Sequence, residues 1–157
     1  MTDRFSTDDG SAGNSPCSDE STVSLGYCGG TFRGIQNKLG YIAGMGFDAI
    51  WLSPVFTTVR DGYHGYWPRN IYQVNPRHSS CGTVEAATRE LKSLVRAAHE
   101  RGLLVMLDIV PNHMGGDSIS ADPPDYAHFS PFNKSEYFHA CRGGELCNGD
   151  CTIKGGG

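Results

Sequence analysis

The sequence predicts an α/β fold built on a parallel sheet. Two apolar segments, 47–53 and 103–110, have the length and composition of buried strands, and an amphipathic helical pattern precedes each of them. Buried strands that alternate with helices form parallel sheets, because a parallel connection must cross back over the sheet. A long loop follows each strand, at the edge where such sheets bind ligands. The 157 residues suit one domain.

The first helix and strand are read from the spacing of apolar residues. Glycines at 44 and 46 end the helical pattern, and Pro54 closes the strand, whose centre is 49–52. The helical stripe has spacings of four, three and three, and consists of Ile35, Leu39, Ile42 and Met45.

The second helix has clearer ends. Thr83 is the expected N-cap, Glu85 lies in the first turn, and Gly102 follows the last turn. The run that follows, 103–110, is almost continuously apolar, so we expect a strand buried on both faces. The apolar positions of the helix are Val84, Ala87, Leu91, Leu94, Val95 and Ala98. The remaining segments are expected to be loops, namely 6–30, 55–82 and the residues after Pro111.

Charge and hydropathy exclude two classes of partner. Thirteen basic and seventeen acidic residues leave a net charge of -4, which argues against a nucleic-acid partner. No apolar run approaches the roughly 18 to 20 residues that span a bilayer, so we expect no membrane segment.

The six cysteines point to an oxidising compartment. No C-x-x-C pair is present, and the last three cysteines are separated by six and four residues, which fits zinc poorly. Disulfides are therefore favoured over metal ligands or free thiols, and they imply an extracellular setting. The residues after Met1 have no apolar signal-peptide region, so we expect the true N-terminus to be missing.

Two motifs carry candidate chemistry. Asp108, Asn112 and His113 follow the second strand and offer a carboxylate, a hard amide oxygen suited to Ca²⁺, and an imidazole. Their alternative role is to cap and shape the turn. The segment 62–67 in the loop after the first strand alternates aromatic residues with His64 and glycines, as suits the apolar faces and hydroxyls of a sugar. Its alternative role is a hydrophobic plug that pins the loop.

With their surroundings, these motifs resemble the α-amylases of glycoside hydrolase family 13, most closely the secreted fungal type. The resemblance runs in order along nearly the whole chain, and 108–115 is similar to the first signature region of the family. The resembling segments are TDRF at 2–5, YCGGTFRGI at 27–35, GMGF at 44–47, AIWLSPV at 49–55, YHGYW at 63–67, HERG at 99–102, DIVPNHMG at 108–115, DY at 125–126 and YFH at 137–139.

The resemblance implies a partial (β/α)₈ TIM barrel. Residues 1–110 would form about its first three strands, with 2–5 at the end of the first one, and 111–157 would begin an inserted domain B. The implied reaction is retaining endo-hydrolysis of α-1,4-glucosidic bonds in starch or glycogen by a secreted, calcium-dependent enzyme that is monomeric when complete. The alternatives are an α-glucosidase or glucanotransferase of the same family, or a non-catalytic remnant that binds glucan or calcium.

The resemblance also implies residue roles. Asp108 would support the active site, Asn112 would bind Ca²⁺ through its side chain, and Glu145 would do so through its backbone carbonyl. Cys81 and Cys151 match no family position. The residues implied to contact substrate are His64, Tyr66, Trp67 and His113. The implied disulfides are Cys17 with Cys28 and Cys141 with Cys147.

The catalytic carboxylates of the family have no counterpart in this sequence. Retaining glycosidases use two carboxyl groups about 5 Å apart, and the family takes them from its fourth and fifth strands, which would lie beyond Gly157. We therefore expect the isolated chain, which would come from a partial clone or an incomplete gene model, to be poorly folded and inactive on starch. Asn133 begins an N-glycosylation acceptor pattern. The remaining loop acids are expected to be solvated turn residues, namely Asp117, Asp122, Asp125 and Asp150.

Overall fold

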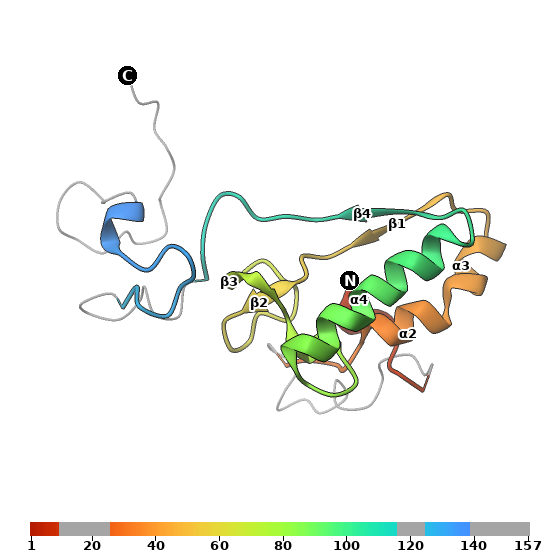
Figure 1. The fold of residues 1–157 in the computed structure, drawn as a ribbon, viewed down its shortest axis with the longest axis horizontal. Helices are drawn as coiled ribbons and strands as arrows, with labels where there is room; N and C mark the ends of the chain where they lie inside the picture. Colours follow the sequence, from red (N-terminus) through yellow and green to blue (C-terminus); the bar gives the residue numbers. More distant parts are fainter. Residues whose placement is uncertain (10–25, 116–124, 139–157) are drawn as a thin grey trace, which may run out of the picture.

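The computed structural model describes residues 1–9, 26–115 and 125–138 (Figure 1). No helix among them is both long and apolar enough to cross a bilayer. The elements, in chain order, are α1 (Thr2–Phe5), α2 (Phe32–Asn37), α3 (Leu39–Gly44), β1 (Ala49–Leu52), β2 (Phe56–Thr58), β3 (Pro68–Val74), the 3₁₀ turn η2 (Pro76–His78), α4 (Val84–His99), β4 (Leu104–Leu107) and the 3₁₀ turn η3 (Ser135–Tyr137).

The parallel sheet predicted from the sequence is confirmed. Strands β1 and β4 pair in parallel with Ala49 opposite Leu104, and α4 is the crossover helix between them (Figure 1). The Thr83 hydroxyl accepts a hydrogen bond from the Ala86 N–H at 3.1 Å and so caps α4 as expected. Gly102 lies beyond the helix with φ +74°, a conformation that favours glycine.

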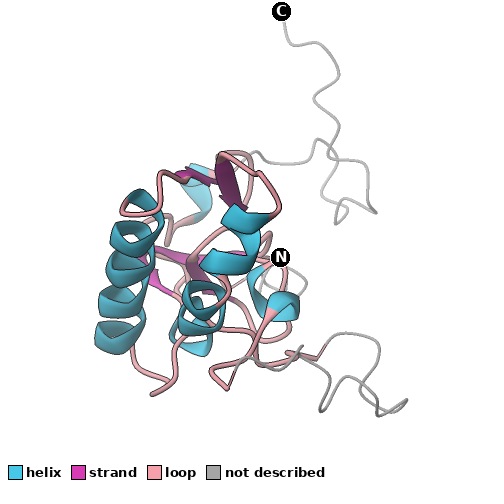
Figure 2. Cartoon of the chain, turned by 90° about the vertical axis from the view of Figure 1, so that its right-hand side faces the viewer, coloured by secondary structure: helices cyan, strands magenta, loops and turns pink. Residues whose placement is uncertain are grey.

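The core lies between the helices and one face of this strand pair. Leu94 of α4 is fully buried there, and Ile50 and Leu52 of β1 point into the same cluster. Helices α2, α3 and α4 cover this face, while strands β1 and β4 lie along one side of the molecule (Figures 1 and 2). The other members of the cluster are Phe32, Ile35, Leu39, Ile42, Val55, Ala87, Ala97, Ala98 and Leu103.

The prediction that 103–110 is buried on both faces is wrong for the described residues. Leu104 is 67% exposed, and Trp51 on the paired strand is 66% exposed. The continuous apolar run results from one face that packs on α4 and a second face that no described residue covers. Strand β4 is also shorter than the predicted run, since it ends at Leu107.

The single helix predicted around 35–45 is two helices. Helix α2 ends and α3 begins at Lys38, whose backbone (φ -100°, ψ 2°) leaves the helical region. The Lys38 N–H bonds to the Ile35 carbonyl at 3.0 Å, a tightened turn that lets the two pieces change direction. Ile35, Leu39 and Ile42 are nevertheless all buried, so the apolar spacing persists across the break.

The predicted loop 55–82 contains a β-hairpin. Strands β2 and β3 are antiparallel, with Phe56 opposite Val74 and Thr58 opposite Pro68, and η2 follows them. The sequence pattern hides β3 because it begins with proline and most of its side chains are partly exposed rather than alternately buried.

The segment Thr2–Phe5, which the resemblance places at the end of a strand, is the single helical turn α1. It docks beside the end of β1, where the Thr2 N–H donates to the Ser53 hydroxyl at 3.0 Å. The Asp3 carboxylate is fully buried and accepts hydrogen bonds from the backbone N–H groups of Cys28 and Gly29 at 2.8 and 3.2 Å. These bonds hold the N-terminal residues at the carboxyl end of β1 despite their helical backbone.

Residues 125–138 pack on the hairpin rather than on the helices. The Ser130 N–H donates to the Arg69 carbonyl at 2.9 Å, and the Ile71 N–H donates to the Ser130 carbonyl at 3.1 Å. A second apolar cluster joins Val59, Met114 and Phe129. This cluster includes residues from both sides of position 110. The boundary between barrel and domain B that the resemblance places at position 110 stays a prediction.

Candidate functional site

Two loops meet at the carboxyl ends of β1 and β4, as the parallel topology predicts. The first holds Tyr66, and the second begins at Asp108. The Tyr66 hydroxyl donates to Asp108 Oδ2 at 2.5 Å, and His113 Nε2–H donates to the Tyr66 carbonyl at 2.8 Å. The structure therefore joins Tyr66 to two sequence-predicted residues that lie more than forty positions further along the chain.

The first loop is shaped by its own backbone bonds and by Gly65. The Val59 N–H donates to the Trp67 carbonyl at 3.0 Å and closes the loop. Gly65 has φ +88°, and a Cβ at this position would lie 2.7 Å from the Pro54 carbonyl oxygen. Only glycine fits that turn, which presents Tyr66 at the surface.

Tyr66 combines an exposed ring with a fixed hydroxyl. The residue is 41% exposed. The hydrogen bond to Asp108 raises the pKa of the Tyr66 phenol, and desolvation and the negative charge of Asp108 act in the same direction. The phenol thus remains a hydrogen-bond donor at neutral pH, and its ring face is available to an apolar surface of a ligand.

The neighbouring rings of His64 and Trp67 support Tyr66. His64 stacks on Tyr66 with 18° between the ring planes and centroids 5.8 Å apart, and it meets Trp67 edge-on at 4.7 Å. Burial lowers the pKa of His64, and the positive charge of Arg4 lowers it further. His64 is therefore neutral at physiological pH, as a packed imidazole should be.

Asn112 and His113 are exposed in the second loop. Because His113 Nε2 carries the proton donated to Tyr66, its Nδ1 is free to accept from Asn112 Nδ2 at 3.3 Å. The Asn112 amide oxygen is a suitable Ca²⁺ donor, but calcium takes six to eight oxygen ligands. The described residues contain no cluster of three or more acidic, histidine or cysteine side chains suited to a metal. Glu145 lies outside them.

The structure describes only some of the cysteines and of the loop aspartates singled out in the sequence. Cys28 is disulfide-bonded, whereas Cys81 carries a free, exposed thiol. Asp125 is a turn residue as expected, since it accepts from the Ala127 N–H and pairs with His128, both at 2.9 Å. The other members of these sets lie outside the described residues, namely Cys17, Cys141, Cys147, Cys151, Asp117, Asp122 and Asp150.

Sequence reasoning missed one residue that contacts this site. The Arg4 guanidinium carbon lies 3.8 Å from the centre of the Tyr63 ring, in the same aromatic loop. The only signal in the sequence was the resemblance of the segment at 2–5, which placed Arg4 at the sheet edge without assigning it a contact.

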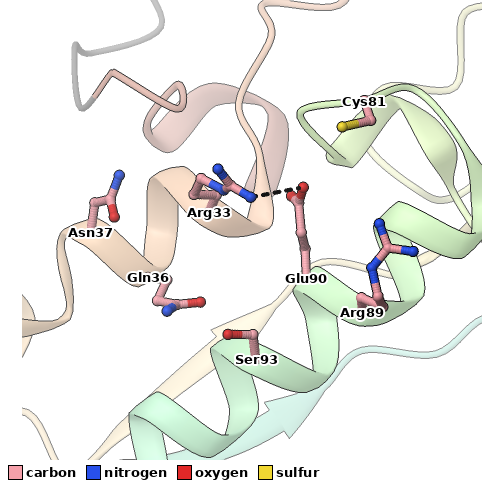
Figure 3. Close-up of a pocket in the computed structure, with 7 residues that line it drawn as sticks. All are labelled: Arg33, Gln36, Asn37, Cys81, Arg89, Glu90 and Ser93. Carbon is pink, nitrogen blue, oxygen red and sulfur yellow. Dashed lines mark ion pairs between the residues drawn. The ribbon is translucent and has the colours of Figure 1, made fainter.

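A separate hollow of about 360 Å³ lies between α2 and α4, outside this site (Figure 3). Arg33 and Glu90 face each other across it at 3.7 Å, and Glu90 also accepts from the Ser80 N–H at 3.2 Å. These contacts attach the loop before α4 to the helices. The lining residues are Arg33, Gln36, Asn37, Cys81, Arg89, Glu90 and Ser93.

Known proteins resemble this chain over most of its length. The family profile described as alpha amylase, catalytic domain, matches residues 1–150. An alpha-amylase of Saccharomycopsis fibuligera is 46% identical over 145 residues, covering 88% of this chain and 27% of the relative. The structure of an alpha-amylase from Malbranchea cinnamomea aligns with a TM-score of 0.74 at 38% identity, covering 89% of this chain and 28% of that one. The alpha-amylase of Geobacillus thermoleovorans, solved in complex with acarbose, aligns with a TM-score of 0.60 at 37% identity, covering 80% and 25%.

The chain spans about a quarter of the length of the curated relatives that it matches. Its β1–α4–β4 unit is therefore part of a (β/α)₈ barrel, the fold of these structural neighbours. Taken with the profile match over residues 1–150, these likenesses show that the chain belongs to the alpha-amylase catalytic-domain family of glycoside hydrolases.

Proposed function

We propose that the protein to which this chain belongs is an α-amylase that cleaves internal α-1,4-glucosidic bonds of starch or glycogen with retention of configuration. The observation that carries this proposal is the contact of Tyr66 with both Asp108 and His113 at the carboxyl ends of the parallel strands. The curated relatives and the two structural neighbours described above support it, because they are named alpha-amylases.

In this proposal the described residues bind and orient one glucosyl unit. The exposed ring of Tyr66 offers a face for the C–H surface of a pyranose, beside Trp67. His113 is exposed and offers a polar edge to sugar hydroxyls. His64 lies behind Tyr66 and shapes the aromatic surface.

Asp108 is assigned a supporting role. Its Oδ2 accepts a hydrogen bond from the Tyr66 hydroxyl, so one carboxylate oxygen already holds the aromatic residue in place. A retaining mechanism needs two carboxyl groups about 5 Å apart, one as nucleophile and one as acid/base. We place both beyond Gly157, as the resemblance implies.

Calcium and secretion belong to the same proposal. Asn112 would give one oxygen ligand and Glu145 another, and the bound Ca²⁺ would supply positive charge that holds the barrel and domain B together. The described residues fit only part of such a site, so no binding step depends on it. The disulfide at Cys28 favours an oxidising, extracellular location.

Linkage-specific binding tests the proposal. Tryptophan fluorescence of the chain should change on titration with maltoheptaose or acarbose, and it should not change with cellohexaose, whose β-linkages present the rings differently. Tyr66→Ala should weaken maltoheptaose binding by about tenfold or more, since it removes the stacking surface. Tyr41→Ala, which removes an exposed tyrosine on α3, is the matched control and should bind as the wild type does. Equal binding of α- and β-linked glucans would contradict the proposal.

A further inference from the structure

Arg4 is held rigidly at the edge of the aromatic loop. Its guanidinium is paired with Asp3, whose buried carboxylate is itself fixed by the backbone N–H groups of Cys28 and Gly29. In this pairing the guanidinium carbon lies over the Tyr63 ring, 3.8 Å from the ring centre. A cation at that distance from a ring centre attracts the ring, and the attraction is stronger when the cation is fixed and partly shielded from water.

Tyr63, which Arg4 holds in place, contacts His64 in turn. The two rings meet edge-on, with centroids 5.0 Å apart and planes at 74°. His64 then makes two contacts with Tyr66. Its ring stacks on the Tyr66 ring, and its Nδ1 accepts a hydrogen bond from the Tyr66 N–H at 2.9 Å. The left-handed backbone of Gly65 between them allows this short return from side chain to main chain.

The hydrogen bond specifies one state of the imidazole. Nδ1 can accept only when it carries no proton, so His64 must be neutral with its proton on Nε2. A second proton would remove the acceptor and replace the bond with repulsion between two donors. The surrounding ionisable groups are Arg4 of α1, the Tyr63 and Tyr66 phenols of the same loop and, reached through Tyr66, Asp108 and His113 beyond β4.

We propose that Arg4 and His64 are positioning residues, which fix the Tyr66 backbone and ring for sugar binding through the contact series Arg4–Tyr63–His64–Tyr66. Tyr66 is then held at three points, its N–H by His64, its carbonyl by His113 and its hydroxyl by Asp108. The inference rests on the proposed function for its ligand, an α-1,4-glucan. It rests on the contacts alone for the state of His64.

The variant Arg4→Gln tests the series in the whole chain, at concentrations where light scattering shows a monomer. Arg60→Gln is the matched control, since Arg60 is an exposed arginine of the same loop whose one ion pair among the described residues is with Asp61 at 4.0 Å. Long-range ¹H–¹⁵N NMR of the imidazoles should show His64 protonated on Nε2 in the wild type. Arg4→Gln should raise the pKa of His64 toward its ordinary value, and Arg60→Gln should leave it unchanged.

Maltoheptaose affinity provides the second measurement. Arg4→Gln should lose several-fold, up to about tenfold, in affinity, as expected when a cation–π contact is removed. The loss of wild-type affinity on acidification should follow the protonation of His64, and in Arg4→Gln it should begin at a higher pH. Since loss of Arg4 could disturb Asp3 and the fold, Tyr63→Leu provides a second variant that leaves the Asp3–Arg4 pair in place and should shift His64 in the same direction.

The outcomes separate the inference from the function on which it rests. A proton on His64 Nδ1, or a His64 pKa that changes in neither Arg4→Gln nor Tyr63→Leu, overturns the positioning series even when maltoheptaose binds. Failure of the wild-type chain to bind maltoheptaose overturns the glucan-binding role proposed for this site and the claim that the series serves a sugar. The inference is also overturned if maltoheptaose affinity falls on acidification at a pH that does not match the pKa of His64.

Discussion

His78 is a buried histidine whose surroundings favour its neutral form. It is 1% exposed, meets Phe32 edge-on at 5.6 Å and leaves its Nδ1 without a partner among the described residues. Burial lowers the pKa of His78, and the opposing influences of the Asp3 carboxylate and the Gly30 backbone are smaller. A single side chain between α2 and the N-terminal segment thus links the stability of the fold to pH.

The pH dependence has a definite sign. In the unfolded chain His78 takes up a proton as the pH falls through its ordinary value of about 6.5, whereas the folded protein resists protonation until a lower pH. Stability is therefore fully present above about 6.5 and falls as the pH drops toward the lowered pKa. His78→Phe should flatten this part of the curve of unfolding free energy against pH. His99→Gln, at an exposed position on α4, should not, and an unchanged slope in His78→Phe would refute the assignment.

At the scale of elements, the β1–α4–β4 unit could be predicted from the spacing of its apolar residues and from the residues that mark the ends of its helix. The residues of β1, α4 and β4 were predictable because apolar spacing separates helix from strand, and because Thr83 and Gly102 mark the ends of α4. The β2–β3 hairpin was not predictable, since it packs against residues 125–138 and, through Val74, against the main core, while the side chains of β3 do not alternate between buried and exposed. The break at Lys38 was hidden because the apolar stripe continues across it.

The same reasoning explains which site residues could be predicted. Asp108 and His113 follow β4, and Tyr66 lies in the segment that follows β1, in the connection between β2 and β3. The carboxyl ends of parallel strands meet at one edge, so the proximity of these two segments follows from topology. The contact of Arg4 with Tyr63 depends instead on how a one-turn helix docks, which no periodic pattern records.

The cap of α4 provides a test at this scale. Thr83→Ala should lower the free energy of unfolding by about 1 kcal/mol, because the Ala86 N–H loses its partner in the first turn. Thr83→Ser keeps the oxygen and should cost much less. Urea denaturation monitored by circular dichroism measures both, and equal losses in the two variants would show that the hydroxyl bond does not stabilise the helix.

At the scale of the whole molecule, one face of the β1–β4 pair is open. Trp51, Leu104 and Ile109 are each more than 60% exposed on these strands or just beyond them. Apolar patches of this kind mark surfaces that another structure covers, and in a (β/α)₈ barrel the interior is filled by side chains of further strands. The β1–β4 pair therefore has one face packed against the helices and one open face, as expected for part of a barrel sheet.

The open face should make the 157-residue chain self-associate. Sedimentation velocity should show species larger than a monomer that grow with concentration, and the double variant Trp51→Ser with Leu104→Ser should reduce them. Tyr72→Ser is the control, because Tyr72 is equally exposed but lies on the hairpin. A wild-type chain that stays monomeric at all concentrations would show that the face is less adhesive than its composition indicates.

The central claim is that Tyr66, Asp108 and His113 form the α-glucan-binding edge of an α-amylase barrel. Its most direct test is an NMR titration of the isotope-labelled chain with maltoheptaose, which locates the bound sugar residue by residue. We expect the largest shifts in the loops 62–67 and 108–115, with none near the hollow between α2 and α4. Shifts centred on that hollow, or shifts that persist unchanged in Tyr66→Ala, would contradict the claim.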